Sequence, residues 1–499
     1  MSISRYLAFD LGAGSGRAVL GSLQDGRLSI HEVHRFPNGP IMIDESFHWD
    51  VGTMLAEIKR GLAAAARAVP DINSIAVDSW GVDFGFVNAE GRLLGAPFCY
   101  RDARHLPAMK AFLKIVPADR LYRRTGLQLL PFNTLFQLYA HILEKSDDLR
   151  SASRILFMPG LLTFLLSGTP ANDATIASTS QLAEPDGSGW CEDLFAALGL
   201  PVGLMGPLVP PGTTIGRLLP SLRSETGCPD LSVIAATGHD TASAVAAVPA
   251  EGEDWAYLSS GTWSLLGLEI DRPIITENSR RFNFTNERGL NGRIRFLKNI
   301  SGLWLLQQCR RRWSEAGPLS YETMWAQAAA APAFRSLIDP DAPEFLNPPD
   351  MPAAIREFCR RTEQDVPVSP AEISRCALES LAMKYRAVLE ELRETSGRPI
   401  RRIHVIGGGC QNELLNTFAA AATGLPVVAG PVEATAIGNI LVQALAQGRV
   451  RSPEEIRLIV ARSFDRRVYE PSPDPGWDDA YGRFLKIVKR TDREEIHEP

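Results

Sequence analysis

Cysteine is scarce in this chain of 499 residues, and no two cysteines form a C-x-x-C motif. The seven are Cys99, Cys191, Cys228, Cys309, Cys359, Cys376 and Cys410. A disulfide framework usually has an even number of cysteines, and a structural zinc site needs closely spaced ligands. We therefore expect reduced thiols that are buried as small hydrophobes, and no structural zinc.

Long hydrophobic runs and an excess of basic charge are also missing. The apolar stretch 155–166 contains Pro159 and Gly160, and it is shorter than the roughly 20 residues of a membrane helix. A strand pattern begins near Tyr6, without the charged and apolar regions of a signal peptide. With 52 basic and 58 acidic residues the formal net charge is −6, so we expect no nucleic-acid or membrane partner. These features favour a soluble cytoplasmic protein.

Residues 6–23 have the pattern of two strands around a turn that contains Gly12, Gly14 and Gly16. Strand-forming residues resume at Ala18, so the segment is predicted to be a hairpin rather than a strand-to-helix loop. It therefore matches neither a Walker A loop nor the dinucleotide fingerprint. Backbone N–H groups in such a turn can bond phosphate oxygens, although most glycine turns are only turns.

The same pattern returns in residues 255–267, where two strands flank a small polar turn. This repeat predicts two similar α/β halves, with domains over 1–248 and 249–485 and a charged tail, 486–499, that frays. In the first half we expect a strand over 29–35, an amphipathic helix over 53–69 and a strand over 74–78. We expect an irregular loop over 79–86 and irregular structure over 98–181.

In the second half the helix signals are clear. Ser369 is a helix cap, followed by Pro370 and by Glu372 at the third helical position, and the apolar face continues as far as Gly397. A strand over 402–406 leads into the glycine turn at 407–409 and another helix. A last helix, rich in alanine and leucine, follows residues 431–439.

Residues 231–245 predict a strand, a turn and a helix with Asp240 at the turn. The simplest interpretation is a helix N-cap, since aspartate oxygens accept bonds from first-turn N–H groups. The alternative is a general base for phosphoryl transfer, which needs one acceptor for the proton of the attacking hydroxyl. A carboxylate near a helix N-terminus stays ionised, so it would be a weak but reliable base, contributing roughly 10²–10⁴-fold.

Three further polar residues each have one structural and one functional interpretation. His239 is either a structural histidine or a donor to a sugar hydroxyl. Asp10 ends the first strand and either initiates the turn or holds Mg²⁺ through water. Arg17 is either a solvated residue at a strand end or a contact to the transferring phosphate.

Several segments together resemble the FGGY carbohydrate kinases, over nearly the whole chain. They are residues 9–17, 78–84, 238–240, 259–263, 407–412 and 433–435. The resemblance implies an α/β fold of two ribonuclease-H-like domains of the actin/hexokinase type, with a catalytic cleft between them. Segments 130–135, 239–245, 297–300, 302–307 and 429–434 are similar to the branch of the family that acts on L-rhamnulose.

This resemblance implies that the γ-phosphoryl group of ATP passes to the C1 hydroxyl of L-rhamnulose, with Mg²⁺ as the metal and Asp240 as the proton acceptor. The residues implied to contact the sugar are Gly81, His239, Asp240, Thr241 and Asn299. Those implied to contact ATP are Ala13, Gly14, Ser15, Gly16, Arg17, Thr262, Gln307 and Gly408. Asp10 is implied to be the carboxylate on the metal side.

Other functions stay open from the sequence. Segment 37–48 matches the family only around Asn38 and Gly39, so the preferred ketose could be L-fuculose or xylulose if this segment closes over the sugar. An actin-like or heat-shock-type ATPase would need a polymerisation surface or a peptide-binding extension. A catalytically inactive sugar sensor would be expected to lack the acidic group at 240. The oligomeric state is not fixed by the sequence.

Overall fold

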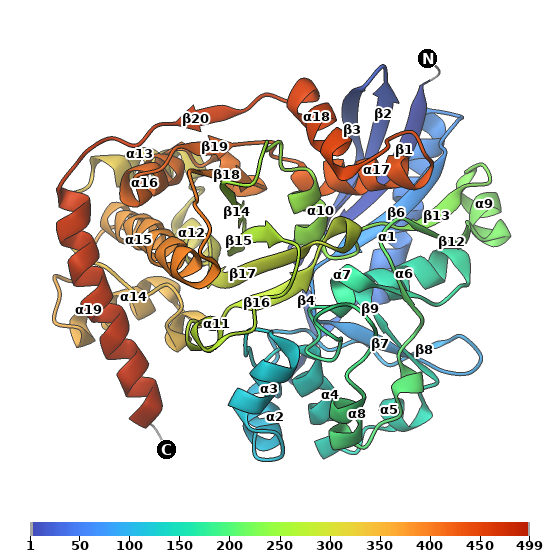
Figure 1. Cartoon of the computed structure of the whole chain (residues 1–499), viewed down its shortest axis with the longest axis horizontal. Coiled ribbons are helices and arrows are strands. Elements are labelled where there is room, and N and C mark those ends of the chain that lie inside the picture. Colours follow the sequence, from blue (N-terminus) through green and yellow to red (C-terminus); the bar gives the residue numbers. More distant parts are fainter. Residues whose placement is uncertain (1–2, 498–499) are drawn as a thin grey trace. The chain divides into compact units, whose positions relative to one another are not determined.

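The computed structural model describes residues 3–497 and contains two compact units, neither continuous in sequence (Figure 1). The first unit comprises Met1–Pro249, Glu269–Phe296 and Glu433–Phe464, and the second comprises Ala250–Leu268, Leu297–Val432 and Asp465–Pro499. The predicted domain boundary between residues 248 and 249 stays a prediction. The first compact unit also contains two later segments of the chain, so the compact units do not test a single boundary. In the described range, no helix has both the length and the apolar character needed to cross a membrane.

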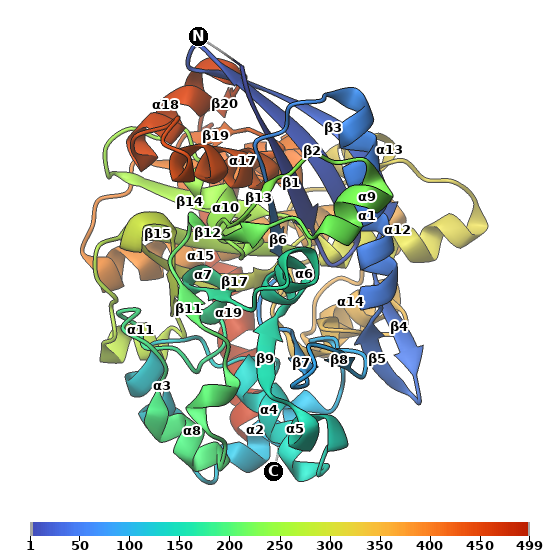
Figure 2. The same ribbon diagram turned by 90° about the vertical axis from the view of Figure 1, so that its right-hand side faces the viewer.

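The first unit is built on a six-stranded sheet with the order β12-β13-β6-β1-β2-β3 (Figure 2). Its strands are β1 (Ser4–Leu11), β2 (Ser15–Gln24), β3 (Arg27–Pro37), β6 (Ser74–Ser79), β12 (Thr213–Arg217) and β13 (Ser232–Ala235). The predicted glycine hairpin is confirmed as β1 and β2, which are antiparallel. Helix α1 (Val51–Ala68) provides the crossover that makes β6 parallel to β1.

The strand register brings three charged residues together. Asp10 lies opposite Arg17 in the antiparallel pair and beside Asp78 in the parallel pair. Nearly all of β1 is buried, as expected for a central strand. The last residues of β1 and β6 therefore place two carboxyl groups at one end of the sheet.

Helices α10 (Asp240–Ala246) and α17 (Ala434–Ala446) pack against each other in the first unit. Their approach depends on Gly438, because a Cβ atom at that position would overlap the carbonyl oxygen of Ser243. Helix α17 also packs against β1 and β6. The segment that begins at Glu433 is thus bound to the same sheet as the amino-terminal hairpin.

The prediction of irregular structure over 98–181 is wrong. This region forms helices α2 (His105–Phe112), α3 (Ala118–Thr125), α4 (Thr134–Leu143), α5 (Asp147–Ser151), α6 (Met158–Ser167) and α7 (Ala174–Ala177), together with strand β9 (Arg154–Phe157). The loop predicted over 79–86 is confirmed only for residues 80–83, because its last residues belong to strand β7 (Phe84–Val87), which pairs with β9. Apolar residues such as Phe112, Leu135 and Phe195 form one buried cluster, and this tertiary burial stabilises short helices with weak local signals.

The second unit repeats the arrangement of the first. Strands β17 (Ile294–Ser301), β15 (Trp263–Ile270), β14 (Trp255–Ser260), β18 (Arg402–Ile406), β19 (Val427–Ala429) and β20 (Arg467–Tyr469) are neighbours in this order. Strands β14 and β15 form an antiparallel hairpin, and β18 is parallel to β14, as β6 is to β1. This confirms the predicted hairpin over 255–267 and the predicted repeat.

Local signals set the ends of helix α15 (Pro370–Ser396) as predicted. Ser369 and Glu372 form a reciprocal capping box, and Gly397 ends the helix with a φ of 65°. The predicted tail does not leave the fold at residue 486, because helix α19 (Gly476–His497) continues past it and Ile487 packs against a core cluster. The last two residues of the predicted tail, 498–499, lie outside the described residues. All seven cysteines are buried and free, as expected.

The remaining strands and helices complete the two units. They are β4 (Pro40–Ile43), β5 (Ser46–Trp49), β8 (Leu93–Leu94), β10 (Asn172–Asp173), β11 (Leu208–Val209), β16 (Thr285–Arg288), α8 (Glu192–Leu198), α9 (Pro220–Thr226), α11 (Glu277–Arg281), α12 (Trp304–Trp313), α13 (Tyr321–Ala330), α14 (Met351–Arg361), α16 (Glu413–Thr423) and α18 (Pro453–Ser463).

Candidate active site

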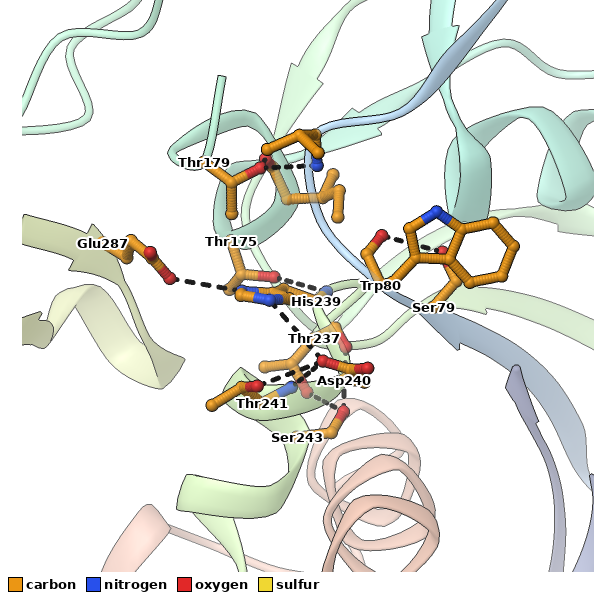
Figure 3. A network of polar contacts seen from close by, with 12 residues as sticks. Ser79, Trp80, Thr175, Thr179, Thr237, His239, Asp240, Thr241, Ser243 and Glu287 are labelled. Atoms are coloured by element: carbon orange, nitrogen blue, oxygen red, sulfur yellow. Dashed lines mark hydrogen bonds and ion pairs between the residues drawn. The ribbon is translucent and has the colours of Figure 1, made fainter. Parts of the chain in front are cut away.

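The turn between β13 and α10 carries the predicted base (Figure 3). The structure corrects one detail, because His239 occupies the N-cap position and Asp240 is the first residue of the helix. One carboxylate oxygen of Asp240 accepts the backbone N–H of Thr241 at 2.5 Å and the Thr241 hydroxyl at 3.1 Å. The carboxylate therefore folds back on its own helix end instead of capping the second or third N–H.

This turn is held on two sides. The backbone N–H of Ser79 donates to the carbonyl oxygen of Gly238 at 2.8 Å, and the N–H of His239 donates to the Thr175 hydroxyl oxygen at 3.2 Å. That hydroxyl in turn donates to the Asp173 carboxylate at 2.5 Å. A Cβ at 238 would overlap the same carboxylate, so a larger residue there would displace the Asp173 side chain. Asp240 is thus placed by a rigid, hydrogen-bonded frame.

The electrostatic surroundings of Asp240 differ from those expected for a carboxylate at a helix N-terminus. Its side chain is 29% exposed, so it is partly withdrawn from water but still accessible. Burial raises the pKa of Asp240 and the neighbouring Asp10 raises it further, while His239 acts in the opposite direction. A carboxylate with a raised pKa is a stronger base at the pH where it is still ionised.

Two residues beside His239 were missed by the sequence reasoning. Arg295 on β17 and Glu287 on β16 are buried, and Nη2 of Arg295 lies 2.9 Å from Oε2 of Glu287. The same Nη2 lies 2.8 Å from Nδ1 of His239, whose Nε2 is 3.5 Å from Oδ1 of Asp240. The one sequence signal was an arginine inside the apolar strand pattern of residues 294–297.

Gly81 lies in a strained loop that follows β6. The next residue, Val82, has a φ of 68°, which is unfavourable for a β-branched side chain. Two hydroxyl groups stabilise it: that of Thr179 accepts from the Val82 N–H at 3.1 Å, and that of Thr134 donates to its carbonyl oxygen at 2.6 Å. Strain that the surroundings impose in this way is typical of functional sites.

A buried carboxylate, Asp83, fixes the other end of this loop. It accepts bonds from the indole N–H groups of Trp49 at 2.6 Å and Trp80 at 2.9 Å, and from the Gln137 amide at 2.8 Å. Burial raises the pKa of Asp83 to about 6 in spite of these donors. Ser79 forms a β-bridge with His239, so the loop that contains Gly81 starts from the strand end beside His239, within the first unit.

The amino-terminal hairpin supplies a second charged cluster. Arg17 donates to the carboxylates of Asp10 and Glu433, so it is a paired, part-buried residue and not a solvated one. Gly14 is exposed with open space where a Cβ would stand, whereas a Cβ on Gly16 would overlap the ring of Phe36. The tip of the turn is accessible to a ligand, and Gly16 serves the packing of the sheet.

Asp78 adds a carboxyl group beside Asp10. It is fully buried, and its Oδ1 has no hydrogen-bond partner among the described residues. Burial raises the pKa of Asp78 well above its usual value, and Asp10 raises it further. No group of three or more His, Cys, Asp or Glu side chains in the described range is arranged to hold a metal ion.

In the second unit, the turn of the β14–β15 hairpin brings Thr262 and Gln307 together. The Thr262 hydroxyl donates to Oε1 of Gln307 at 3.2 Å. The backbone of Gly302 approaches so closely that a Cβ would lie 2.6 Å from the carbonyl carbon of Trp263. Asn299 lies on β17, three residues before this contact.

Gly408 lies beside the same hairpin. The following residue, Gly409, is packed so that a Cβ would lie 3.0 Å from the carbonyl oxygen of Ser260 and overlap its side chain. Gly408 itself is exposed, with no atom within 4 Å of the position that a Cβ would take. Its backbone is therefore accessible, and a ligand can approach it closely.

The comparisons with known proteins agree with this arrangement. The models of the FGGY family of carbohydrate kinases match residues 5–247 (N-terminal domain) and 256–447 (C-terminal domain). A rhamnulokinase of Bacteroides thetaiotaomicron is 46% identical, with 97% of this chain and 99% of that protein covered. A rhamnulokinase of Enterococcus faecalis is 39% identical, with 96% and 97% covered.

Among solved structures, the ligand-bound xylulose kinase of Lactobacillus acidophilus superimposes with a TM-score of 0.82 at 16% identity, covering 98% of both chains. This likeness shows that the fold is the two-domain α/β fold of sugar kinases. Together with the family matches over almost the whole chain, it identifies the protein as a member of the FGGY family of carbohydrate kinases, and so as an enzyme that phosphorylates a carbohydrate.

Proposed function

We propose that this enzyme transfers the γ-phosphoryl group of ATP to the C1 hydroxyl of L-rhamnulose, giving L-rhamnulose 1-phosphate. The observation that supports L-rhamnulose as the substrate is the sequence identity of 46% and 39%, over nearly the full length, to two proteins named rhamnulokinase. The family name supports a carbohydrate as acceptor and ATP as donor.

Asp240 is the proposed general base. It accepts the proton of the sugar hydroxyl while the oxygen of that hydroxyl forms a bond to the γ-phosphorus, and the bond from phosphorus to ADP breaks. Its raised pKa, its partial exposure and its rigid frame support this role. Because phosphoryl transfer needs little covalent help, the position of the base matters more than its strength.

The proposed sugar contacts are Gly81, His239, Asp240, Thr241 and Asn299. In the first unit, the strained loop at Val82 presents the backbone of Gly81, and the imidazole of His239 presents a ring nitrogen beside Asp240. Side chains whose polar groups are already fixed by neighbours bind a hydroxyl with little loss of entropy. Asn299 is proposed from the resemblance alone.

The proposed nucleotide contacts are Ala13, Gly14, Ser15, Gly16, Arg17, Thr262, Gln307 and Gly408. The exposed glycines at 14 and 408 support close approach of phosphate to the backbone. The guanidinium of Arg17 could neutralise negative charge on a phosphate group. It would then bind the phosphate in addition to the carboxylates of Asp10 and Glu433. Gly16 is proposed from the resemblance, and its absence of a side chain leaves room for the ring of Phe36 beside the turn.

Mg²⁺ is the proposed metal, and Asp10 is its proposed protein ligand. The residues present fit an ion that keeps most of its water. Asp10 offers a carboxylate, and one oxygen of Asp78 has no hydrogen-bond partner among residues 3–497, but in that range no closed set of protein ligands surrounds them. When bound, the ion would neutralise negative charge on the phosphate groups. Asp10 and Asp78 would orient its water shell from the end of the sheet.

We further propose that the enzyme acts in the cytoplasm. The supporting observation is that all seven cysteines are buried free thiols, which suits a reducing compartment.

The test is turnover on a panel of 2-ketoses, L-rhamnulose, L-fuculose, xylulose and ribulose, with ADP release measured in stoichiometric amounts. We expect the highest kcat/KM with L-rhamnulose and one ADP for each sugar phosphate. A clear preference for another ketose would overturn the substrate assignment. In that case the segment around β4 and β5, where the sequence departs from the family, would be the first place to examine.

A further inference from the structure

We propose that Arg295 is a positioning residue for the reaction: it fixes His239 in the neutral tautomer that carries its proton on Nε2. The catalytic consequence rests on the proposed function. The tautomer itself is a property of the protein without any ligand, so it can be tested separately.

The argument begins with the chemistry of the guanidinium group. Arginine has only N–H donors and no acceptor, and it stays protonated. Nη2 of Arg295 lies 2.8 Å from Nδ1 of His239, which is a hydrogen-bond distance. Nδ1 must therefore be the acceptor in this bond. A neutral imidazole that accepts at Nδ1 has its proton on Nε2.

Glu287 makes this arrangement stable. The same Nη2 lies 2.9 Å from Oε2 of Glu287, so its two hydrogens serve one acceptor each. Nε of Arg295 donates to the carbonyl oxygen of Arg288 at 3.1 Å, which fixes the plane of the guanidinium. Arg295 is fully buried and Glu287 nearly so, and therefore water does not compete for these bonds.

The opposite tautomer has its own partner in the site. Oε2 of Glu287 is 3.4 Å from Nδ1 of His239, so a proton on Nδ1 would point toward a carboxylate if Arg295 were absent. Arg295 blocks this alternative, because its N–H occupies the acceptor site at Nδ1. The choice of tautomer thus depends on one buried side chain.

The consequence lies on the other side of the ring. The charged and titratable groups around His239 are Arg295 on β17, Glu287 on β16, Asp173 on β10 and Asp240 on α10. Nε2 lies 3.5 Å from Oδ1 of Asp240. With its proton there, the ring donates toward the base or toward a sugar hydroxyl bound beside it. With the opposite tautomer, the lone pair of Nε2 of His239 would face the lone pairs of Oδ1 of Asp240, and the two atoms would repel each other.

The first experiment observes the tautomer directly. NMR spectra of the ligand-free full-length enzyme, labelled with ¹⁵N-histidine, should show an unprotonated Nδ1 and a protonated Nε2 for His239, assigned with His239→Gln. In Arg295→Met, we expect the proton to move to Nδ1, where it can bond to Glu287. A protonated Nδ1 in the wild-type enzyme, or an unchanged tautomer in Arg295→Met, would overturn the proposal.

Kinetics test the consequence, with whichever ketose the panel shows to be turned over. Arg295→Met should lower kcat/KM for the sugar by roughly tenfold or more, while KM for ATP stays within about twofold. Arg293→Met is the matched control, since Arg293 lies two residues away and pairs with Asp271 at the surface. Equal losses in both variants, or a change confined to KM for ATP, would contradict the role.

A second pair of variants keeps the test valid if Arg295→Met does not fold. The amide nitrogen of glutamine reaches the position of Nε2, whereas that of asparagine reaches only the position of Nδ1. We therefore expect His239→Gln to retain more of kcat/KM for the sugar than His239→Asn. Equal activity, or the reverse order, would show that donation from Nε2 has no role.

Discussion

Asn439 donates a hydrogen bond of 2.5 Å from its amide to Oδ2 of Asp78, a residue 361 positions away in the sequence. The other oxygen of Asp78 has no such partner in the described range, and Asp10 lies beside it in the parallel register. The carboxyl group is therefore buried, only half satisfied and next to a second acid. Such a group opposes folding when it is ionised.

Asp78→Asn should stabilise the enzyme at high pH. Burial and Asp10 raise the pKa of Asp78 in the folded state, so the unfolded chain releases this proton at lower pH than the folded protein does. The wild-type free energy of unfolding then falls as the pH rises above the unfolded-state pKa, and the variant lacks this loss.

Urea unfolding at several pH values measures the effect. We expect the advantage of Asp78→Asn to be largest at about pH 8 and to shrink toward pH 4. Asp71→Asn, at a largely exposed aspartate, is the control and should show no pH-dependent gain. A constant difference across the pH range would contradict the explanation.

Asp83 gives a prediction with a defined pH window. Its pKa of about 6 in the folded state lies above the value near 4 of an unfolded aspartate. Between these values unfolding releases a proton, so this group lowers the free energy of unfolding by up to about 1.4 kcal/mol per pH unit as the pH rises. Asp83→Asn should lack that component of the slope between pH 4 and pH 6. An identical slope in both proteins would refute it.

Gly438→Ala should destabilise the first unit. The added Cβ would overlap the carbonyl oxygen of Ser243, so helices α10 and α17 must separate, at a cost of about 1–3 kcal/mol or more. Thermal unfolding is the measurement. Gly482→Ala in helix α19 is the control, because no atom lies within 4 Å of its Cβ position, and it should unfold at the same temperature or slightly higher. Equal effects would argue against the close helix contact.

Gly408 and Gly409 are adjacent but should respond differently to substitution. Gly408→Val places a side chain in open space, so stability should be kept while KM for ATP rises, because the side chain occupies the space proposed for the nucleotide. Gly409→Ala should lower the unfolding temperature instead, because its Cβ meets Ser260. Steady-state kinetics at varied ATP, beside thermal unfolding, separates the two. An unchanged KM in Gly408→Val would remove Gly408 from the nucleotide site.

Features with local signals could be predicted from the sequence. The capping box at Ser369 and Glu372 and the glycine at 397 define helix α15, since each acts on backbone groups a few residues away. The two hairpins were predictable because glycine turns and strand periodicity lie within one short segment. The function could be predicted because several of these short segments together resemble one family of enzymes.

Features that depend on distant contacts could not be predicted. The helices over 105–177 are short, and burial against one another stabilises them more than propensity does. Arg295 and Glu287 come close to His239 only in the folded sheet, and Glu433 reaches Arg17 from 416 residues away. The cap position of Asp240 was wrong by one residue, because local sequence does not fix where the first helical turn begins.

The central claim is that Asp240 accepts the proton of the sugar hydroxyl. In Asp240→Asn, we expect kcat for ketose phosphorylation to fall by roughly two to four orders of magnitude, while ATP binding and the unfolding temperature stay near wild type. Asp230→Asn, a surface aspartate ten residues earlier that pairs with Arg217, is the control and should keep full activity. Near-normal turnover of Asp240→Asn in an ADP-release assay would contradict the account.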